Sequence, residues 1–221
     1  MNLTAGRGEC LRIIPDAEGW LIKYRHDIGL YYLNHLPATS PNSITLEDLA
    51  VTLLMNSRAG SSAAVSISRF GHDVDLTEIP DTLLEETASE DRDRTADLIA
   101  RLSNLPFHGF GASLATKLLH KKRPRLIPVL DNQAIFGAYM NAFWPSSPAG
   151  QDTVKSKVRI REALESIYYD ITRDENLELW PQLSTIEPSR SRVELFDMIW
   201  WIYFRHVQPV RKPSELPGEN V

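Results

Sequence analysis

Apolar residues recur every three to four positions along most of this chain, the spacing that gathers them on one face of an α-helix. The pattern predicts five longer helices, over residues 20–36, 61–70, 92–102, 153–171 and 191–206. Val158 is expected on the buried face of the fourth, and a further helix is expected to follow Ser43 or Thr45 as its N-cap. Alternation typical of strands is confined to short stretches near residues 10–15 and 125–130. The sequence therefore predicts an all-α fold.

Length and composition limit the class of protein. A chain of 221 residues can bury one substantial core or two small helical lobes. Its 43% hydrophobic and 24% charged residues are typical of a globular chain and not of a disordered one. No apolar run approaches the roughly 18 residues that a membrane span requires, and the N-terminus lacks the apolar core of a signal peptide. We therefore expect a cytoplasmic protein.

Residues that hold metals are few. Cys10 is the single cysteine, which excludes an internal disulfide, a zinc site of four cysteines and an iron–sulfur cluster held by four local thiolates. The six histidines show no metal-ligand spacing. We therefore expect no metal and no cofactor.

Charge is distributed unevenly along the chain, whose net charge is −5. Residues 71–100 hold ten Asp or Glu and two Arg, a balance of −8. Residues 101–161 hold ten Lys or Arg and two Asp, a balance of +8. A segregated positive field is what phosphate binding uses, but two solvated faces of opposite charge give the same counts. Charge alone leaves both interpretations open.

The triplet Gly109-Phe110-Gly111 stands directly before a predicted helix that begins near Ala112. Two glycines around one apolar residue permit a tight turn with positive φ angles, and they leave the first N–H groups of the helix open. Open amides and the positive end of the helix dipole suit one DNA phosphate, while Phe110 is expected to anchor the turn in the core. The pattern favours a phosphate-binding hairpin, although the triplet alone also occurs in plain turns.

Residues 105–120 resemble the hairpin of the helix-hairpin-helix DNA glycosylases of the endonuclease III superfamily, which typically reads Leu-Pro-Gly-Val-Gly before a helix of small residues. Phe107-His108-Gly109-Phe110-Gly111 follows this pattern except at its first two positions, and Ala115 stands at the family's usual alanine. A basic loop with prolines then leads to Asp131, and Ile127-Pro128-Val129-Leu130-Asp131 is similar to the adenine-glycosylase version, Phe-Pro-Ile-Leu-Asp. The stretch Lys122–Pro128 also resembles uncharacterised bacterial proteins, for which the family supplies no activity.

The resemblance implies that Asp131 is the catalytic residue of a glycosylase. Breaking a base–sugar bond develops oxocarbenium charge on the deoxyribose, and a nearby carboxylate stabilises that charge and orients or deprotonates the attacking water. An aspartate before a helix is also a favoured N-cap, by about 1 kcal/mol. Catalysis and capping alone both remain open for Asp131.

The resemblance also indicates the product. In the bifunctional members, a lysine two positions after the second hairpin glycine forms a Schiff base with the sugar and permits strand cleavage. Ser113 occupies that position here. We therefore expect a monofunctional enzyme that leaves an abasic site.

Further residues are expected to contact the DNA or the extruded base. The candidate DNA contacts are Gly109, Gly111, Ser113, Lys117, Lys121, Lys122, Arg123 and Arg125, with His120 beside them. Asn56 lies roughly where the family sets pocket residues. The candidates for stacking on a flipped base are Tyr31, Tyr32, Trp144, Trp200 and Trp201.

The resemblance implies a two-lobed helical fold that binds double-stranded DNA as a monomer. Residues 1–44 and 138–221 form one expected lobe, with a loose tail at 208–221, and residues 45–137 form the hairpin lobe, with the base pocket between them. A non-catalytic DNA-binding protein and a helical interaction protein without DNA are the alternatives. The base stays open among damaged, mispaired and bulky modified ones, and a modified cytosine such as some phages carry implies antiviral defence.

Overall fold

The computed structural model describes residues 1–28, 36, 39–55, 59–106, 110–144 and 156–207. Within them the chain is mostly helical, with a single antiparallel pair of short strands, which confirms the predicted all-α class. The strands and longer helices are β1 (Leu3–Ala5), β2 (Arg12–Ile14), α1 (Ala17–Ile28), α2 (Ala50–Leu54), α3 (Ser61–Phe70), α4 (Ser89–Ser103), α5 (Ala112–Lys122), η7 (Asn132–Tyr139), α6 (Met140–Phe143), α7 (Lys157–Thr172), α8 (Leu179–Ile186) and α9 (Arg192–Val207). Short helical turns lie between them at η1 (Gly8–Cys10), η3 (Leu46–Leu49), η4 (Gly71–Asp73), η5 (Leu76–Glu78), η6 (Leu84–Glu86) and η8 (Asp174–Asn176).

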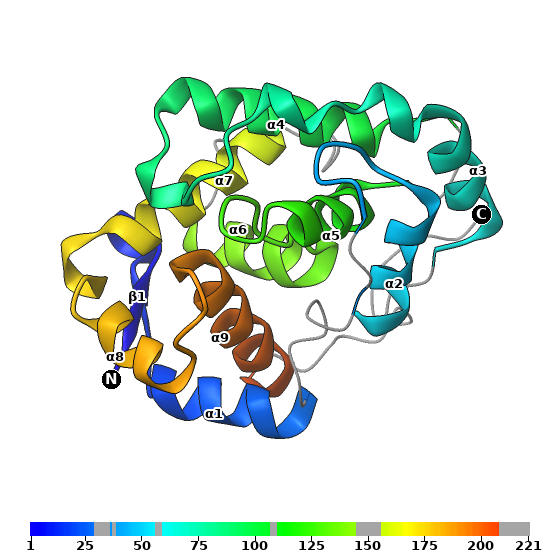
Figure 1. Cartoon of the computed structure of the whole chain (residues 1–221). Helices are drawn as coiled ribbons and strands as arrows, with labels where there is room; N and C mark the ends of the chain where they lie inside the picture. Colours follow the sequence, from blue (N-terminus) through cyan, green and yellow to red (C-terminus); the bar gives the residue numbers. More distant parts are fainter. Residues whose placement is uncertain (29–35, 37–38, 56–58, 107–109, 145–155, 208–221) are drawn as a thin grey trace, which may run out of the picture.

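The outer helices are arranged around α5 and α6, which lie at the centre of the molecule (Figure 1). α4 packs against α7 along one side of the molecule and α1 packs against α9 on the other, with α5 and α6 between them (Figure 1). The core beneath these helices includes fully buried Leu98, Leu118, Tyr139 and Trp200. The central elements α5 and η7 are therefore enclosed by neighbours, and they position the candidate site.

Several predicted boundaries agree with the structure. α3 spans the predicted residues 61–70, and α5 begins at Ala112 as predicted. Thr45 is the N-cap of η3, and its N–H donates to the Asp48 carboxylate at 2.8 Å. The predicted continuation of α1 to residue 36 falls largely outside the described residues. Helix α8 was not predicted from the sequence.

Two predictions about helices and strands are wrong. Val158 is 58% exposed, because the buried residues Ile160, Ala163 and Ile167 define the inner face of α7 and Val158 lies about 160° around the helix from it. Residues 125–130 form no strand. Residues 124–126 instead form a turn, and backbone groups of Ile127, Val129 and Leu130 are paired with side chains of α5 and α9, as described below.

The buried apolar residues form one connected core. It draws on both segments predicted as separate lobes, for example Leu21 and Phe196 from one and Leu98 and Leu118 from the other. The division into two lobes stays a prediction. No helix in the described part of the chain is long and apolar enough to cross a membrane.

Candidate functional site around Asp131

Asp131 caps the helix η7. Its Oδ1 atom accepts hydrogen bonds from the N–H groups of Gln133 and Ala134, at 2.8 and 2.9 Å, and its backbone is extended (φ −69°, ψ 140°). The capping role predicted for Asp131 is therefore confirmed. The helix that follows is a π-helix, a wide form that occurs mostly in short pieces and frequently at functional sites.

Ser113 of α5 contacts the other oxygen of this carboxylate, and Lys117 of α5 lies close enough to feel its charge. The Ser113 hydroxyl donates to Asp131 Oδ2 at 3.4 Å. Lys117 lies one turn further along α5 and is only 7% exposed. Burial lowers the pKa of the Lys117 ammonium, and the negative charge of Asp131 acts in the opposite direction. A carboxylate, a hydroxyl and a buried amine therefore share one site.

One face of α5 holds the segment that leads to Asp131. Thr116 accepts a hydrogen bond from the Leu130 N–H at 3.0 Å, and its own hydroxyl donates to Ala112 O. The buried His120 ring contacts the Ile127 carbonyl at 2.5 Å through Nδ1, which must donate because the carbonyl accepts. Burial lowers the pKa of His120 and favours its neutral form. The segment is thus fixed by side chains where it lacks a partner strand.

These α5 residues form a polar stripe on one face of the helix. Ser113, Thr116, Lys117 and His120 follow the i, i+3, i+4, i+7 spacing of one helix face. Buried polar groups are costly unless they are hydrogen-bonded. Their spacing in a helix with buried leucines was the available signal for Thr116 and for a structural role of His120.

A second helix holds the same segment from another side. Asp197 of α9 accepts from the Val129 N–H at 2.9 Å, and the Trp200 indole N–H donates to the Ala134 carbonyl at 2.8 Å. Burial raises the pKa of Asp197 well above its usual value, and the charge of Glu194 raises it further. Neither contact was predicted, since both residues lie more than 60 positions from their partners.

The two carboxylate oxygens of Asp131 have different contacts, and this difference indicates which reactions the site can support. Oδ1 is occupied by two backbone N–H groups, which fix the orientation of the side chain. Oδ2 has the long Ser113 contact and keeps further accepting capacity, because a carboxylate oxygen accepts about two hydrogen bonds. Asp131 is also partly exposed. A fixed, accessible carboxylate is suited to orient a water molecule and to stabilise positive charge.

The hairpin before α5 is described only in part. Gly109 lies outside the described residues. Gly111 is the N-cap of α5 with φ −153° and ψ 174°, an extended conformation, so the positive φ expected there is wrong. Phe110 is 2% exposed, which confirms its place in the core. The extended N-cap leaves the first amides of α5 at the helix terminus, as expected of a phosphate site.

Most of the predicted phosphate contacts have internal partners. Lys121 and Lys122 form ion pairs with buried Asp48, at 2.6 and 2.9 Å, and Arg123 is 6% exposed and donates to Pro41 O. These three side chains, like that of Lys117, lie inside the protein, so the structure corrects our expectation that they form an exposed phosphate-binding surface. Arg125 is the exposed member of the set: 53% of its side chain is accessible, and its guanidinium lies 3.9 Å from the exposed carboxylate of Asp81.

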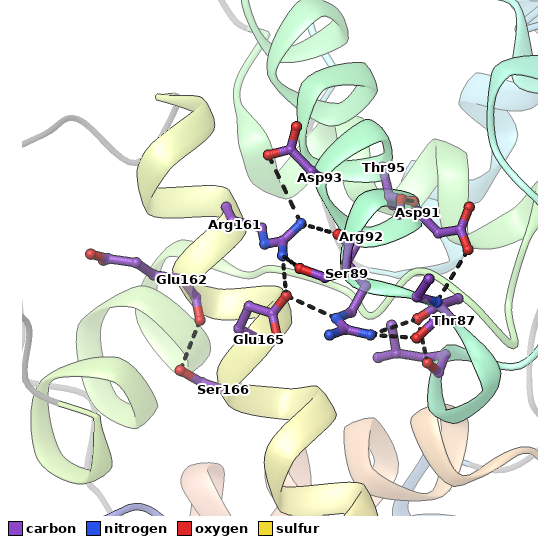
Figure 2. A network of polar contacts seen from close by, with 12 residues as sticks. Thr87, Ser89, Asp91, Arg92, Asp93, Thr95, Arg161, Glu162, Glu165 and Ser166 are labelled. Carbon is purple, nitrogen blue, oxygen red and sulfur yellow. Dashed lines mark hydrogen bonds and ion pairs between the residues drawn. The ribbon is translucent and has the colours of Figure 1, made fainter.

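Ion pairs within the protein account for part of the unequal charge distribution along the chain. Arg161 and Lys157 of the basic segment meet Asp93 of the acidic segment, at 3.9 and 2.9 Å. Figure 2 shows Arg161 on α7 between Asp93 of α4 and Glu165, which also pairs with Arg92. The two segments therefore neutralise one another in part where α4 packs against α7, which weakens the inference of a phosphate-binding field.

The predicted base-pocket residues are placed only in part. Asn56, Tyr31 and Tyr32 lie outside the described residues. Trp144 is largely buried, and its indole N–H donates to Asp170 at 3.0 Å, while Trp200 is 1% exposed. Trp144 and Trp200 are thus core residues rather than exposed stacking surfaces. Among the described residues no cluster of three or more His, Cys, Asp or Glu side chains could hold a metal ion.

Residues 32–203 match DUF6308, described as a family of unknown function. No curated protein and no solved structure matches the chain.

Proposed function

We propose a function for this chain, which belongs to the DUF6308 family of unknown function: it is a monofunctional DNA glycosylase with Asp131 as its catalytic carboxylate. The observation that carries this proposal is the meeting of Asp131 with Ser113, 18 residues earlier, at the first turn of the helix that follows the hairpin. The resemblance assigns catalysis to Asp131 and the lysine position to Ser113, and this contact brings the two positions together.

The proposed reaction breaks the C1′–N bond of a flipped nucleotide. The base leaves with the bonding electrons and takes up a proton from the solvent, while water adds its oxygen to C1′ and gives a proton to the Asp131 carboxylate, which returns it to the solvent. The Asp131 carboxylate stabilises the positive charge that develops on the sugar, and its Oδ2 atom orients the water. Ser113 has no amine, so the sugar forms no Schiff base there and the strand stays intact.

The DNA would be held by the backbone at the start of α5 and by Arg125. Helix N-termini bind phosphate through open N–H groups and the helix dipole, and Gly111 places no side chain over them. Replacing Gly109 and Gly111 together by valine should weaken DNA binding whether or not the chain is catalytic. Unchanged affinity in that double variant contradicts the hairpin anchor.

Asp131→Asn is the decisive variant, since asparagine and aspartate are about equally good N-caps. Its stability should stay close to that of the wild type, while base release should fall by at least about 100-fold with loss of the carboxylate. Release is measured by mass spectrometry of free bases from DNAs that carry damaged, mispaired or modified bases. Asp75→Asn is the matched control, because Asp75 also caps a helical turn by accepting from Thr77 N.

A non-catalytic DNA-binding protein is the second candidate. It is favoured by the two hydrogen bonds that Asp131 Oδ1 accepts, which account for an aspartate at this position without any reaction. It predicts DNA binding by the wild-type chain, no base release from any of these substrates and no effect of Asp131→Asn. Base release that survives in Asp131→Asn removes the catalytic role.

A further inference from the structure

Helix α9 contacts the chain on both sides of Asp131. Asp197 Oδ2 accepts from the N–H of Val129, two residues before Asp131. Trp200, one turn further along α9, donates its indole N–H to the carbonyl of Ala134, three residues after it. α9 and η7 also pack directly against each other. The position of Asp131 therefore depends on a helix more than 60 residues away in the sequence.

The backbone of Val129 links Asp197 to Asp131. Val129, whose N–H binds Asp197, has a carbonyl that accepts from the Asp131 N–H at 3.0 Å. The Asp131 carboxylate in turn caps the N–H of Ala134, the residue whose carbonyl Trp200 holds. Movement of Val129 would therefore move both the backbone and the capping geometry of Asp131.

The environment of position 197 is unfavourable for a charged aspartate side chain. The Asp197 carboxyl accepts a hydrogen bond from the Val129 N–H, and burial disfavours its charged form. An apolar side chain would avoid that cost but would leave the Val129 N–H without this acceptor, and unpaired backbone groups are rare in folded proteins. The hydrogen bond to Val129 thus accounts for a polar side chain at position 197.

We propose that Asp197 is a positioning residue that holds Asp131 in its reactive orientation through the Val129 peptide, an inference that rests on the proposed function of the Asp131 site. Asp197 acts through the backbone and does not touch the substrate. Its contribution is to the rate of base release and not to the affinity for DNA.

Three variants at position 197 test this role in the full chain. Asp197→Leu removes the acceptor, Asp197→Asn keeps a neutral one, and Asp197→Glu moves the carboxylate by one methylene. Under single-turnover conditions Asp197→Leu and Asp197→Glu should release base roughly 10- to 100-fold more slowly, the loss expected when a reacting group is displaced by about 1 Å. Asp197→Asn should recover most of that loss, and DNA affinity should stay unchanged in all three. Asp75→Leu, which removes an acceptor of a backbone N–H elsewhere, is the control.

A second readout does not require glycosylase activity. Amide hydrogen exchange at Val129, Gln133 and Ala134 should be faster in Asp197→Leu than in the wild type, and close to the wild type in Asp197→Asn. Wild-type rates of both exchange and release in Asp197→Leu and Asp197→Glu overturn the proposal. If the wild-type chain releases no base, the proposed function fails and exchange alone decides the role of Asp197. If Asp197→Leu does not fold, Asp197→Glu supplies the same two measurements.

Discussion

The Ser113 hydroxyl lies 3.4 Å from Asp131 Oδ2, although the two residues belong to different helical elements and are 18 positions apart. Ser113 stands in the first turn of α5, and Asp131 stands at the N-cap of η7. A side chain longer than serine at position 113 would therefore reach the carboxylate and a substrate bound beside it.

Changes at Ser113 should alter the product more than the rate. Ser113→Ala removes one long hydrogen bond and no proton-transfer group, so release should fall by less than about tenfold, which is below the range of roughly 100- to 10,000-fold for proton-transfer effects. Ser113→Lys should allow borohydride to trap a covalent protein–DNA complex, because it places an amine at position 113, one turn before Lys117 and at the position of the lysine in bifunctional members. Trapping and strand breaks are read on denaturing gels. A trapped complex with the wild-type chain contradicts the monofunctional proposal.

The salt dependence of DNA binding should separate exposed cations from buried ones. Arg125→Ala should reduce the slope of log K against log [salt] by about 0.9, the value for one phosphate contact in duplex DNA. Lys121→Met and Lys122→Met should leave the slope unchanged, because both ammonium groups are paired with Asp48. The slopes come from titrations of labelled duplex at several salt concentrations, below the unfolding temperature of each variant. A smaller slope for either lysine variant means that the ion pair opens to meet DNA.

Local features of the sequence were sufficient to predict helices and caps but not distant partners. The start of α5 at Ala112, the bounds of α3 and the caps at Thr45 and Asp131 follow from residues within a few positions of each other. Lys121 looked like a phosphate contact because its partner, Asp48, lies 73 positions away, and a single sequence contains no information on such pairing.

The candidate site shows the same difference between local and distant information. The neighbours of Asp131 on α5 lie within 18 residues and share a helical spacing that can be read directly. Asp197 offered no such signal, since its contact with Val129 depends on how α9 packs across the core. Polar residues on the buried face of a helix are thus the most useful local indication of such contacts.

Removal of Asp48 should destabilise the fold strongly. Asp48 is fully buried, and hydrogen bonds led by that from Lys121 hold its pKa below the usual value although burial acts to raise it. Asp48→Ala leaves two buried ammonium groups without their carboxylate, which should cost about 3–5 kcal/mol. The unfolding temperature should fall by roughly 6–20 °C for a domain of this size. Asp75→Ala, at an exposed cap, is the control, and equal losses in the two variants contradict a structural role of the Asp48 cluster.

The stability of the protein should depend on pH through Asp170. This fully buried carboxylate accepts from Tyr139 Oη at 2.6 Å, from Trp144 Nε1 and from the Gly6 N–H. Burial raises its pKa from 3.8 to about 6 despite these hydrogen bonds. The native state therefore binds this proton more tightly than the unfolded state. The resulting stabilisation is complete below pH 3.8 and is lost as pH rises through about 6.

The size of this effect follows from the shift, which corresponds to about 3 kcal/mol between the two ends of the window. In urea unfolding curves recorded across that range, Asp170→Asn should lack this contribution, whereas Asp174→Asn on the neighbouring turn should retain it. Tyr139→Phe removes a donor that lowers the pKa of Asp170, so the upper edge of the window should move to higher pH. Parallel pH profiles for the wild type, Asp170→Asn and Tyr139→Phe would show that Asp170 titrates alike in the folded and unfolded chains.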